Sequence, residues 1–295
     1  WKNDKKDGQG IFISQIGDRY EGDWKNDKMN GKGTFLYSDG RKYDGDFRDD
    51  SFHGQGTFRY SNGSLYTGDW KNDKQEGHGT LTYLDGETYV GEWKNGKMSG
   101  DGIYTYTNGN SYDGKFLDGM KNGPGIFTFT NGNEYEGDWE NDKKNGQGTF
   151  IYSNGEKYIG EWKNGKMEGL GTFNFKNGDQ YEGDWKDDQA HGQGTFRYST
   201  GNTYTGELKK DKRDGRGTIN YLNGDSYDGD WKNDHVHGEG IFTNAAGDKY
   251  EGDWKNDKKD GQGIFISQIG DRYEGDWKND KMNGKGTFLY SDGRK

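Results

Sequence analysis

Cysteine is absent from the 295 residues, and proline occurs only once. Without Cys, the chain has no disulfide, no thiol nucleophile and no Cys-ligated zinc or iron–sulfur site. Hydrophobic residues make up only 26% of the sequence, too few for the compact core of a globular enzyme of this length. No segment approaches the ~18 consecutive apolar residues that define a membrane-spanning helix.

Positive charge is also scarce relative to negative charge. The 41 Lys and Arg residues are outnumbered by 51 Asp and Glu residues, so the formal net charge is −10. Nucleic-acid binding needs a basic stripe that neutralises phosphates, so we expect no nucleic-acid partner. Anionic headgroups attract polybasic segments, whereas bases alternate with acids in this chain, so direct membrane binding is not expected.

Aromatic residues and glycine are abundant instead. Phe, Trp and Tyr make up 16% of the chain, and there are 54 Gly residues. Low hydrophobicity alone would predict disorder, but disordered segments are poor in aromatic residues. The aromatic side chains are therefore expected to form a packed face.

The sequence repeats with a period of 23 residues that never slips. Residues 1–19 are a partial repeat, and residues 20–295 contain twelve complete repeats, each beginning with Tyr at position 1. Of the 54 glycines, 51 fall at positions 3, 12, 14 and 21 of the repeat. We therefore interpret residues 1–295 as one continuous repeat array.

Each repeat has the residue pattern of a β-hairpin. Gly at position 21 usually follows Asn or Asp, as in Asn62-Gly63, Asp85-Gly86 and Asn108-Gly109. These dipeptides favour two-residue type I′ turns, because both central residues adopt positive φ. Successive strands are therefore predicted to run antiparallel.

One face of the predicted sheet carries the aromatic residues. Positions 1, 3 and 5 (Tyr66, Gly68 and Trp70 in one repeat) are two residues apart and share a face, as do positions 14, 16 and 18. Glycine in a strand often marks close approach of another group, so we expect each Gly to accommodate a ring from a neighbouring repeat. The residues assigned to packing are Tyr66, Trp70, Tyr89, Trp93, Tyr135, Trp139, Phe150, Tyr158, Trp162, Tyr181 and Trp185, and those assigned to turns and backbone approach are Gly63, Gly68, Gly77, Gly79, Gly86, Gly137, Gly146, Gly148 and Gly155.

The opposite face carries charge. Position 4 is acidic in 11 of the 12 complete repeats, and position 6 is basic in 10 of 12. Opposite charges on one face of a sheet support weak cross-strand pairs. This pattern predicts a solvated, charged surface.

The repeat resembles the MORN (membrane occupation and recognition nexus) repeat. One repeat shows every anchor of the pattern, with Tyr135, Gly137, Trp139, Gly146, Gly148, Phe150 and Gly155. Departures are local: Phe47, Phe116 and Leu208 replace the Trp at position 5. The resemblance implies an all-β fold, an elongated solenoid-like array of antiparallel β-hairpins that forms a single twisted sheet. Similar repeats occur in junction proteins and plant lipid kinases, which implies a scaffold or membrane-junction module as an alternative function.

A second, longer period overlies the first. Residues 254–295 are identical to residues 1–42, and the offset of 253 residues is eleven repeats of 23. Other repeats differ freely, so the hairpin alone does not account for this identity. Because the chain also starts within a repeat, at Trp1, we expect it to be an excerpt of a longer periodic fibre.

Few residues suggest a ligand site. His235 and His237 lie near Asp234 and Glu239 and form a weak candidate for metal binding. The Asn/Asp-rich loops lack the alternating oxygen ligands of a calcium loop. Carboxylates recur identically in every repeat, which argues against a tuned catalytic pair, so no enzyme activity and no cofactor are expected.

Carbohydrate binding is a further alternative. Exposed aromatic and apolar side chains at variable positions would provide it, and Phe52, Tyr104 and Leu117 are the candidates. The leading hypothesis remains a structural filament or rigid spacer that assembles with itself, with a protein or carbohydrate partner possible. For its location, an extracellular or cell-surface appendage is favoured over a cytoskeletal strut.

Overall fold

The computed structural model describes residues 4–295, which form β-strands joined by short turns. Over this range every regular element is a strand, and no helix is present that has the length and apolarity to cross a membrane. The expected all-β fold of antiparallel hairpins is confirmed. Short strands rich in Tyr, Trp, Thr and Phe, separated by turn residues, account for this result.

The chain divides into two units, Trp1–Gly146 and Gln147–Lys295. The strands of the first unit are β1 (Gly8–Ile13), β2 (Arg19–Lys25), β3 (Lys28–Leu36), β4 (Lys42–Arg48), β5 (Ser51–Arg59), β6 (Leu65–Lys71), β7 (Lys74–Thr82), β8 (Thr88–Lys94), β9 (Lys97–Thr105), β10 (Ser111–Leu117), β11 (Met120–Thr128) and β12 (Glu134–Glu140). Strand β13 (Lys143–Ile151) contains the boundary. The strands of the second unit are β14 (Lys157–Lys163), β15 (Lys166–Asn174), β16 (Gln180–Lys186), β17 (Gln189–Arg197), β18 (Thr203–Lys209), β19 (Lys212–Asn220), β20 (Ser226–Lys232), β21 (His235–Thr243), β22 (Lys249–Lys255), β23 (Lys258–Ile266), β24 (Arg272–Lys278) and β25 (Lys281–Leu289).

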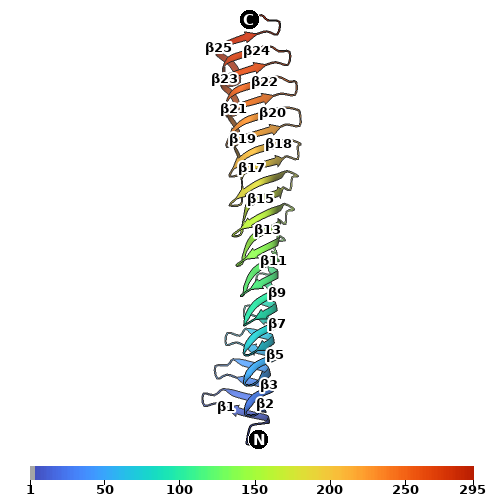
Figure 1. Ribbon diagram of the computed structural model, residues 1–295, viewed down its shortest axis with the longest axis vertical. Helices are drawn as coiled ribbons and strands as arrows, with labels where there is room; N and C mark the ends of the chain where they lie inside the picture. The colour runs from blue at the N-terminus through green and yellow to red at the C-terminus, as the bar shows by residue number, and fades with distance from the viewer. Residues whose placement is uncertain (1–3) are drawn as a thin grey trace. The chain divides into compact units, whose positions relative to one another are not determined.

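Within each unit, strands that are consecutive in the chain pair antiparallel. This holds from β1 to β12 in the first unit and from β14 to β25 in the second. Figure 1 shows the hairpins of each unit following one another in chain order. Among the described residues, β1 of the first unit pairs only with β2, and β25 of the second unit pairs only with β24.

The tight hairpin turns lie at repeat positions 7 and 8, which the sequence reasoning did not assign. Lys71 pairs with Lys74, so Asn72 and Asp73 alone form the connection, with φ of 48° and 64°. Two successive residues with positive φ define a type I′ turn, which suits Asn, Asp and Gly. The signal in the sequence was the Asn-Asp, Asp-Asp or Asn-Gly pair that follows position 6 in most repeats.

The expected type I′ turns at position 21 are wrong. Gly63 has φ of +88°, but Asn62 is not among the residues with positive φ. Tyr60 N–H donates to the Ser64 carbonyl at 2.9 Å, and Gly63 N–H donates to the Tyr60 carbonyl at 3.0 Å. These bonds close a three-residue loop with Gly in the left-handed position. The same pattern occurs at Gly86 and Gly109, so Asp85 and Asn108 are likewise not type I′ residues.

The core of each unit lies on the aromatic face of its sheet. The assigned packing residues are all buried there, each at most 7% exposed: Tyr66, Trp70, Tyr89, Trp93, Tyr135, Trp139, Phe150, Tyr158, Trp162, Tyr181 and Trp185. The core is therefore a row of rings along the strands, and each repeat contributes the same few positions.

Candidate functional site: the contact between successive repeats

The Tyr at position 1 covers a pair of glycines in its own repeat. Gly68 and Gly79 face each other across β6 and β7, and a Cβ atom added to Gly79 would lie 2.3 Å from the Tyr66 hydroxyl oxygen. Tyr66 also donates from its hydroxyl to the Asp69 carbonyl at 3.0 Å. The expectation that a neighbouring repeat's ring fills this gap is corrected: the ring directly over the glycines belongs to the same repeat.

The Trp at position 5 connects one repeat to the preceding one. Trp70 packs edge-to-face on Tyr43 of the preceding repeat, with ring centroids 5.4 Å apart, and on its own Tyr66 at 5.1 Å. Its indole N–H donates to the Gly56 carbonyl, also in the preceding repeat, at 3.1 Å. Each Trp is therefore held by two hairpins.

The indole hydrogen bond recurs along both units. The remaining bonds of this kind, from Trp Nε1 to a position-14 carbonyl, join Trp24 to Gly10, Trp93 to Gly79, Trp139 to Gly125, Trp162 to Gly148, Trp185 to Gly171, Trp231 to Gly217, Trp254 to Gly240 and Trp277 to Gly263, at 3.0–3.3 Å. Phe47, Phe116 and Leu208 preserve the apolar contact but have no side-chain N–H to donate. The repeat interface thus combines aromatic packing with one directional bond.

Glycines assigned to turns and backbone approach fall into three structural roles. Gly63, Gly86 and Gly155 have φ near +90° in the three-residue loops. Gly68, Gly79 and Gly137 are members of cross-strand glycine pairs, and the Gly148 carbonyl accepts the Trp162 bond. Gly77 and Gly146 lie at position 12, where φ is +65° and +80°.

The acid at position 4 closes a β-bulge beside the position-12 glycine. The register shifts between Gly68 and Trp70, and the carboxylate of the intervening Asp69 accepts the His78 backbone N–H at 2.8 Å. A Cβ atom on Gly77 would lie 2.5 Å from that carboxylate. The acids assigned to a solvated charged face thus also satisfy a backbone donor of the bulge.

The bond of this kind in the hairpin of β24 and β25 also lowers the pKa of its acid. In β24 and β25, the backbone N–H of Lys285 donates to Asp276 at 2.8 Å, and together with Gln262 it lowers the pKa of the Asp276 carboxyl. A hydrogen bond to the charged form favours ionisation.

The Asp at position 8 joins the two-residue turn to the preceding repeat. Asp73 accepts the Phe52 backbone N–H through its carboxylate at 2.8 Å, and its own N–H donates to the Phe52 carbonyl at 3.1 Å. Gly96 and Gly119 occupy the same position and retain only the backbone bond, to Gln75 and Met98. Sequence reasoning missed this contact, although Asp recurs at position 8.

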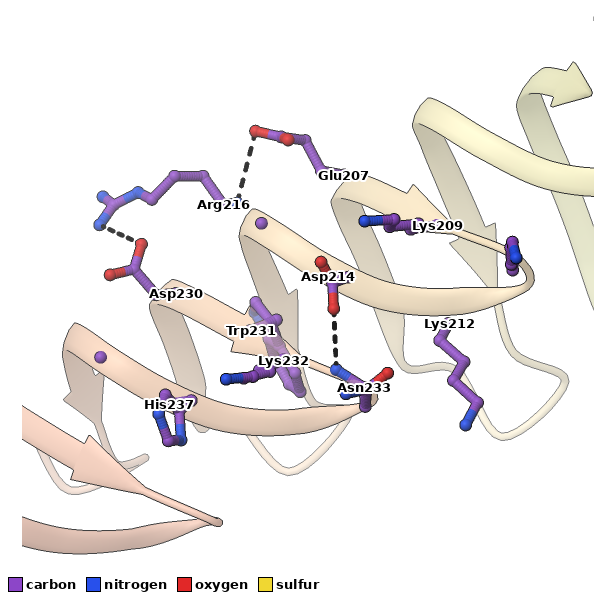
Figure 2. A pocket seen from close by; sticks show the side chains of 13 residues that line it. Glu207, Lys209, Lys212, Asp214, Arg216, Asp230, Trp231, Lys232, Asn233 and His237 are labelled. Atoms are coloured by element: carbon purple, nitrogen blue, oxygen red, sulfur yellow. Dashed lines mark hydrogen bonds and ion pairs between the residues drawn. The ribbon is translucent and has the colours of Figure 1, made fainter.

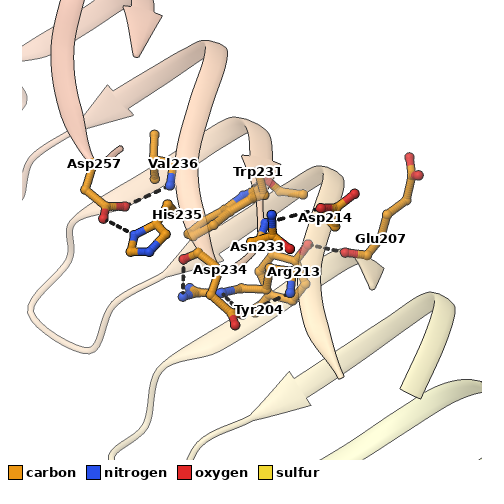
Figure 3. Close-up of polar contacts among 11 residues, drawn as sticks. Tyr204, Glu207, Arg213, Asp214, Trp231, Asn233, Asp234, His235, Val236 and Asp257 are labelled. Carbon is orange, nitrogen blue, oxygen red and sulfur yellow. Dashed lines mark hydrogen bonds and ion pairs between the residues drawn. The ribbon is translucent and has the colours of Figure 1, made fainter. Parts of the chain in front are cut away.

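Position 10 faces the aromatic side and carries a cation in four of the twelve complete repeats. The Arg213 guanidinium lies 4.0 Å from the Trp231 ring centroid, and Figure 3 shows it between Tyr204, Trp231 and Asp234. Lys121 is 4.8 Å from Trp139 in the same way. Such cation–π contacts add attraction at each repeat interface. Burial lowers the pKa of Lys259, which occupies this position over Tyr250 and Trp277.

Burial perturbs the tyrosines at position 1 strongly. It raises the pKa of Tyr66 well above its ordinary value, and the nearby Asp69 carboxylate adds to the shift. The same cause raises the pKa of Tyr20, Tyr89, Tyr135 and Tyr158. Their recurrence in nearly every repeat is typical of packing rather than of one catalytic site.

The histidine pair has two different environments. His235 Nδ1 lies 2.5 Å from the Asp257 carboxylate, as Figure 3 shows, whereas His237 Nδ1 is buried without a hydrogen-bond partner. Among residues 4–295, no three His, Asp or Glu side chains are grouped to hold a metal ion. The weak metal candidate therefore gains no third ligand.

The three residues proposed as candidates for carbohydrate binding differ in how far they are buried. The expectation of exposure is wrong for Phe52, which is 8% exposed and stacks on Tyr43 with ring centroids 3.8 Å apart. Tyr104 is half-buried and its hydroxyl bonds to Glu87. Leu117 is 54% exposed. A shared aromatic binding face is therefore not formed by these three residues.

Comparison with known proteins identifies the repeat. The MORN repeat model matches residues 1–19, 20–40, 43–65, 66–88, 89–111, 112–134, 135–157, 158–180, 181–203, 204–226, 227–249, 250–272 and 273–293. These thirteen segments follow the 23-residue period through the whole chain, and the resemblance inferred from the anchor residues is confirmed. No curated protein matches the sequence.

Solved structures show only distant likeness. The TCP domain of SAS-4 from Drosophila melanogaster, in complex with a proline-rich motif of Ana2, is 12% identical, covers 60% of this chain and 85% of its own, and has a TM-score of 0.31. The wild-type TCP10 domain of Danio rerio CPAP is 8% identical, with coverages of 90% and 94% and a TM-score of 0.17. Virginiamycin B lyase from Staphylococcus aureus is 10% identical, with coverages of 90% and 94% and a TM-score of 0.16. These values carry no functional argument.

Proposed function

Because the chain belongs to the MORN repeat family, we propose that it is a structural protein whose stacked hairpins continue as a long filament or rigid spacer. A MORN array is in general a repeat scaffold. The finer proposal rests on one observation, the identity of residues 254–295 with residues 1–42 at an offset of eleven repeats. An exact recurrence at a whole number of repeats is what a periodic fibre requires, since each block then meets the next in register.

The repeat contacts supply a mechanical function. Each interface within the units carries the backbone ladder, and most also carry a ring contact and an indole hydrogen bond to the preceding repeat. Nearest-neighbour contacts of this type make stability approximately additive along an array. Acids engaged with backbone donors, such as Asp69, support a structural role for the recurrent carboxylates, and we expect no enzyme activity.

Electron microscopy of the protein tests this proposal. With two strands per repeat, each repeat adds roughly 10 Å, so fibres built on an eleven-repeat block give a layer line at roughly 1/110 Å⁻¹, or a modestly shorter spacing if supercoiled. Particles of uniform, short length without that periodicity would contradict the filament and favour a finite scaffold that holds partners.

Variants at the repeat interface test whether the stability of the fibres depends on the aromatic packing. Trp139→Ala and Trp162→Ala remove buried indoles that bond to Gly125 and Gly148, so fibres should fragment. Trp139→Phe is the matched control, because Phe already occupies this position at Phe47 and retains the ring contact. Fibres of unchanged stability in both Ala variants would contradict the packing assignment.

A further inference from the structure

Lysines gather around a groove at the two-residue turns of two successive repeats in the second unit. The groove has a volume of about 810 Å³, and we define the cationic groove by Lys209, Lys210, Lys212 and Lys232, with Arg216 at its rim. Figure 2 shows Lys209, Lys212 and Lys232 around the turn between β18 and β19 and the turn that follows β20. Positions 6 and 9, which Lys209, Lys212 and Lys232 occupy, are basic in most repeats, and Lys210 and Arg216 add two cations at positions that are rarely basic elsewhere. The groove is therefore a local excess of positive charge on a protein of net charge −10.

The acids that line the groove already have partners. Glu207 accepts the Arg216 backbone N–H at 3.4 Å, and Asp214 accepts the Asn233 backbone N–H at 3.2 Å. Asp230 lies 3.6 Å from the Arg216 guanidinium, as the dashed line in Figure 2 marks. In the part of the chain that the structure describes, none of the four lysines has a carboxylate within ion-pair distance. Their charge is left for another molecule to neutralise.

Lys210 departs from the turn chemistry of every other repeat. Its φ is 53°, and the other non-glycine residues with positive φ in residues 4–295 are all Asn or Asp. Asn and Asp tolerate this left-handed conformation through local hydrogen bonds, whereas Lys has no such compensation. A disfavoured residue retained at an exposed turn is an observation that points to function.

The groove thus combines lysines that have no carboxylate partner with a disfavoured Lys at a turn, over two repeats.

We infer that the cationic groove binds the acidic two-residue turns of a second copy of this chain. Asp49-Asp50 and Asp187-Asp188 are acidic turns. In each turn the second carboxylate, Asp50 or Asp188, accepts a backbone N–H of the preceding repeat, whereas the first, Asp49 or Asp187, is 65% or 61% exposed beside Lys28 or Lys166. Copies of net charge −10 repel one another, so lateral contact between them requires a patch of opposite sign. The cationic groove carries the positive charge that such a contact requires. The acidic turns carry the complementary negative charge and, like the groove, lie at hairpin ends. This inference rests on the proposed filament function and names the contact by which filaments associate sideways.

Charge reversal with a matched control tests the contact. Lys209→Glu/Lys212→Glu changes positions 6 and 9 of the repeat 204–226, and Lys71→Glu/Lys74→Glu makes the same change at the same positions of the repeat 66–88. Sedimentation velocity at low and high salt measures self-association of the full chain. We expect the groove variant to associate on the order of tenfold more weakly at low salt, and the control to match the wild type. Equal weakening in both variants, or none in the groove variant, would overturn the inference.

Substitutions that restore the common turn residue separate binding from folding. Lys210→Asn should raise the thermal midpoint while it weakens association, because Asn suits the left-handed position and removes one charge. On the acidic side, Asp49→Asn and Asp187→Asn in a single chain should weaken association with the fold retained, since Asn72 already occupies the same turn position. Association that survives both sets of changes would contradict the contact.

Three outcomes distinguish this inference from the proposed function. If the wild type fails to assemble at any salt concentration, the filament function is wrong and the inference falls with it. If fibres form normally but the groove variant bundles like the wild type, only the lateral contact is wrong. If the groove variant self-associates normally but no longer binds phosphatidylserine vesicles, the groove binds a membrane surface. The inference that it binds a second copy of the chain is then wrong.

Discussion

Two repeats of identical sequence, 20–42 and 273–295, have different surroundings in the structure. Strand β3 of the first pairs with both β2 and β4, whereas β25 of the second pairs with β24 alone among the described residues. Tyr20 is fully buried, but Tyr273 is 7% exposed. Met29 is half-buried, whereas the equivalent Met282 is 46% exposed. Since the sequences are the same, these differences come from the following repeat.

For the Trp residues of the same two repeats the difference in burial is reversed: the Trp of the first repeat is the more exposed one. Trp277 is 7% exposed and packs on Tyr250 of a complete preceding repeat at 5.1 Å. Trp24 is half-buried. Among the described residues of the partial repeat before it, Phe12 is the ring that it packs on, at 6.3 Å, and it also bonds to the Gly10 carbonyl. The Trp at position 5 is thus buried by the preceding repeat. The Tyr at position 1 and the residue at position 10 are buried by the following repeat. A repeat is completed on both sides by its neighbours.

The largest expected effect is alkaline unfolding. Burial raises the pKa of the position-1 tyrosines, such as Tyr20 and Tyr66, so the folded state holds their protons more tightly than the unfolded state. This contribution to stability is fully present below the ordinary tyrosine pKa of about 10 and is lost as the pH rises toward the folded values. Tyrosinate absorbance and circular dichroism should change together. Full ionisation near pH ~10 with the sheet intact would contradict the burial that distinguishes complete repeats.

Removing the tyrosine from each copy should have unequal effects. Tyr20→Ala should cost roughly 3–5 kcal/mol of the free energy of unfolding, as for other large buried rings. Tyr273→Ala should cost about 1 kcal/mol less, because Tyr20 also packs on Phe47 of the following repeat and Tyr273 has no such ring contact among the described residues. Urea unfolding followed by tryptophan fluorescence measures both. Equal losses would show that the following repeat adds nothing.

Substitutions whose contacts lie within one hairpin should instead reduce the free energy of unfolding equally in the two copies of the repeat. Gly33→Ala and Gly286→Ala would place a Cβ atom 2.5 Å and 2.4 Å from their own tyrosines, Tyr20 and Tyr273. Overpacking of this kind costs roughly 1–3 kcal/mol. The same urea measurement should therefore give similar losses for both, and a loss confined to Gly33→Ala would mean that the clash depends on the neighbouring repeat.

The smallest effect is expected at the bulge acid. Asp23→Ala and Asp276→Ala each leave one backbone donor, that of Lys32 or Lys285, without its carboxylate, and the exposed site makes the loss of stability small. Because the pKa of Asp276 is lowered in the folded state, its contribution is present above the ordinary Asp pKa and is lost as the pH falls. Stability measured between neutral and acidic pH should decline less in Asp276→Ala than in the wild type. An unchanged decline would contradict this role.

Much of the fold was predictable because the repeat is short and regular. The spacing of Tyr66, Gly68 and Trp70 on one strand face gave the aromatic core, since alternation in a strand leaves no other arrangement. The turn types were misassigned because Asn-Gly and Asn-Asp both tolerate positive φ, and only the backbone bonds around Tyr60 and Lys71 separate a three-residue from a two-residue connection.

Contacts between repeats were harder to predict. The sequence pattern alone predicts that the Asp69 carboxylate is a surface charge. Its partner, the His78 backbone N–H, could not be predicted, because the β-bulge that shifts the strand register brings the two groups together. Similarly, Phe52 and Arg213 lie at a variable position, and its variability suggested exposure. The position is instead covered by the ring of the following repeat, Trp70 or Trp231.

Hydrogen exchange measured by mass spectrometry tests most directly whether neighbouring repeats complete each other. Peptides from residues 20–42 and 273–295 have the same sequence and mass, so they report on two environments in one isotopic envelope. We expect two populations of equal size, one slow and one fast, because β3 is paired on both sides and β25 on one. A single population exchanging at one rate would contradict the claim that burial and stability come from the adjoining repeat.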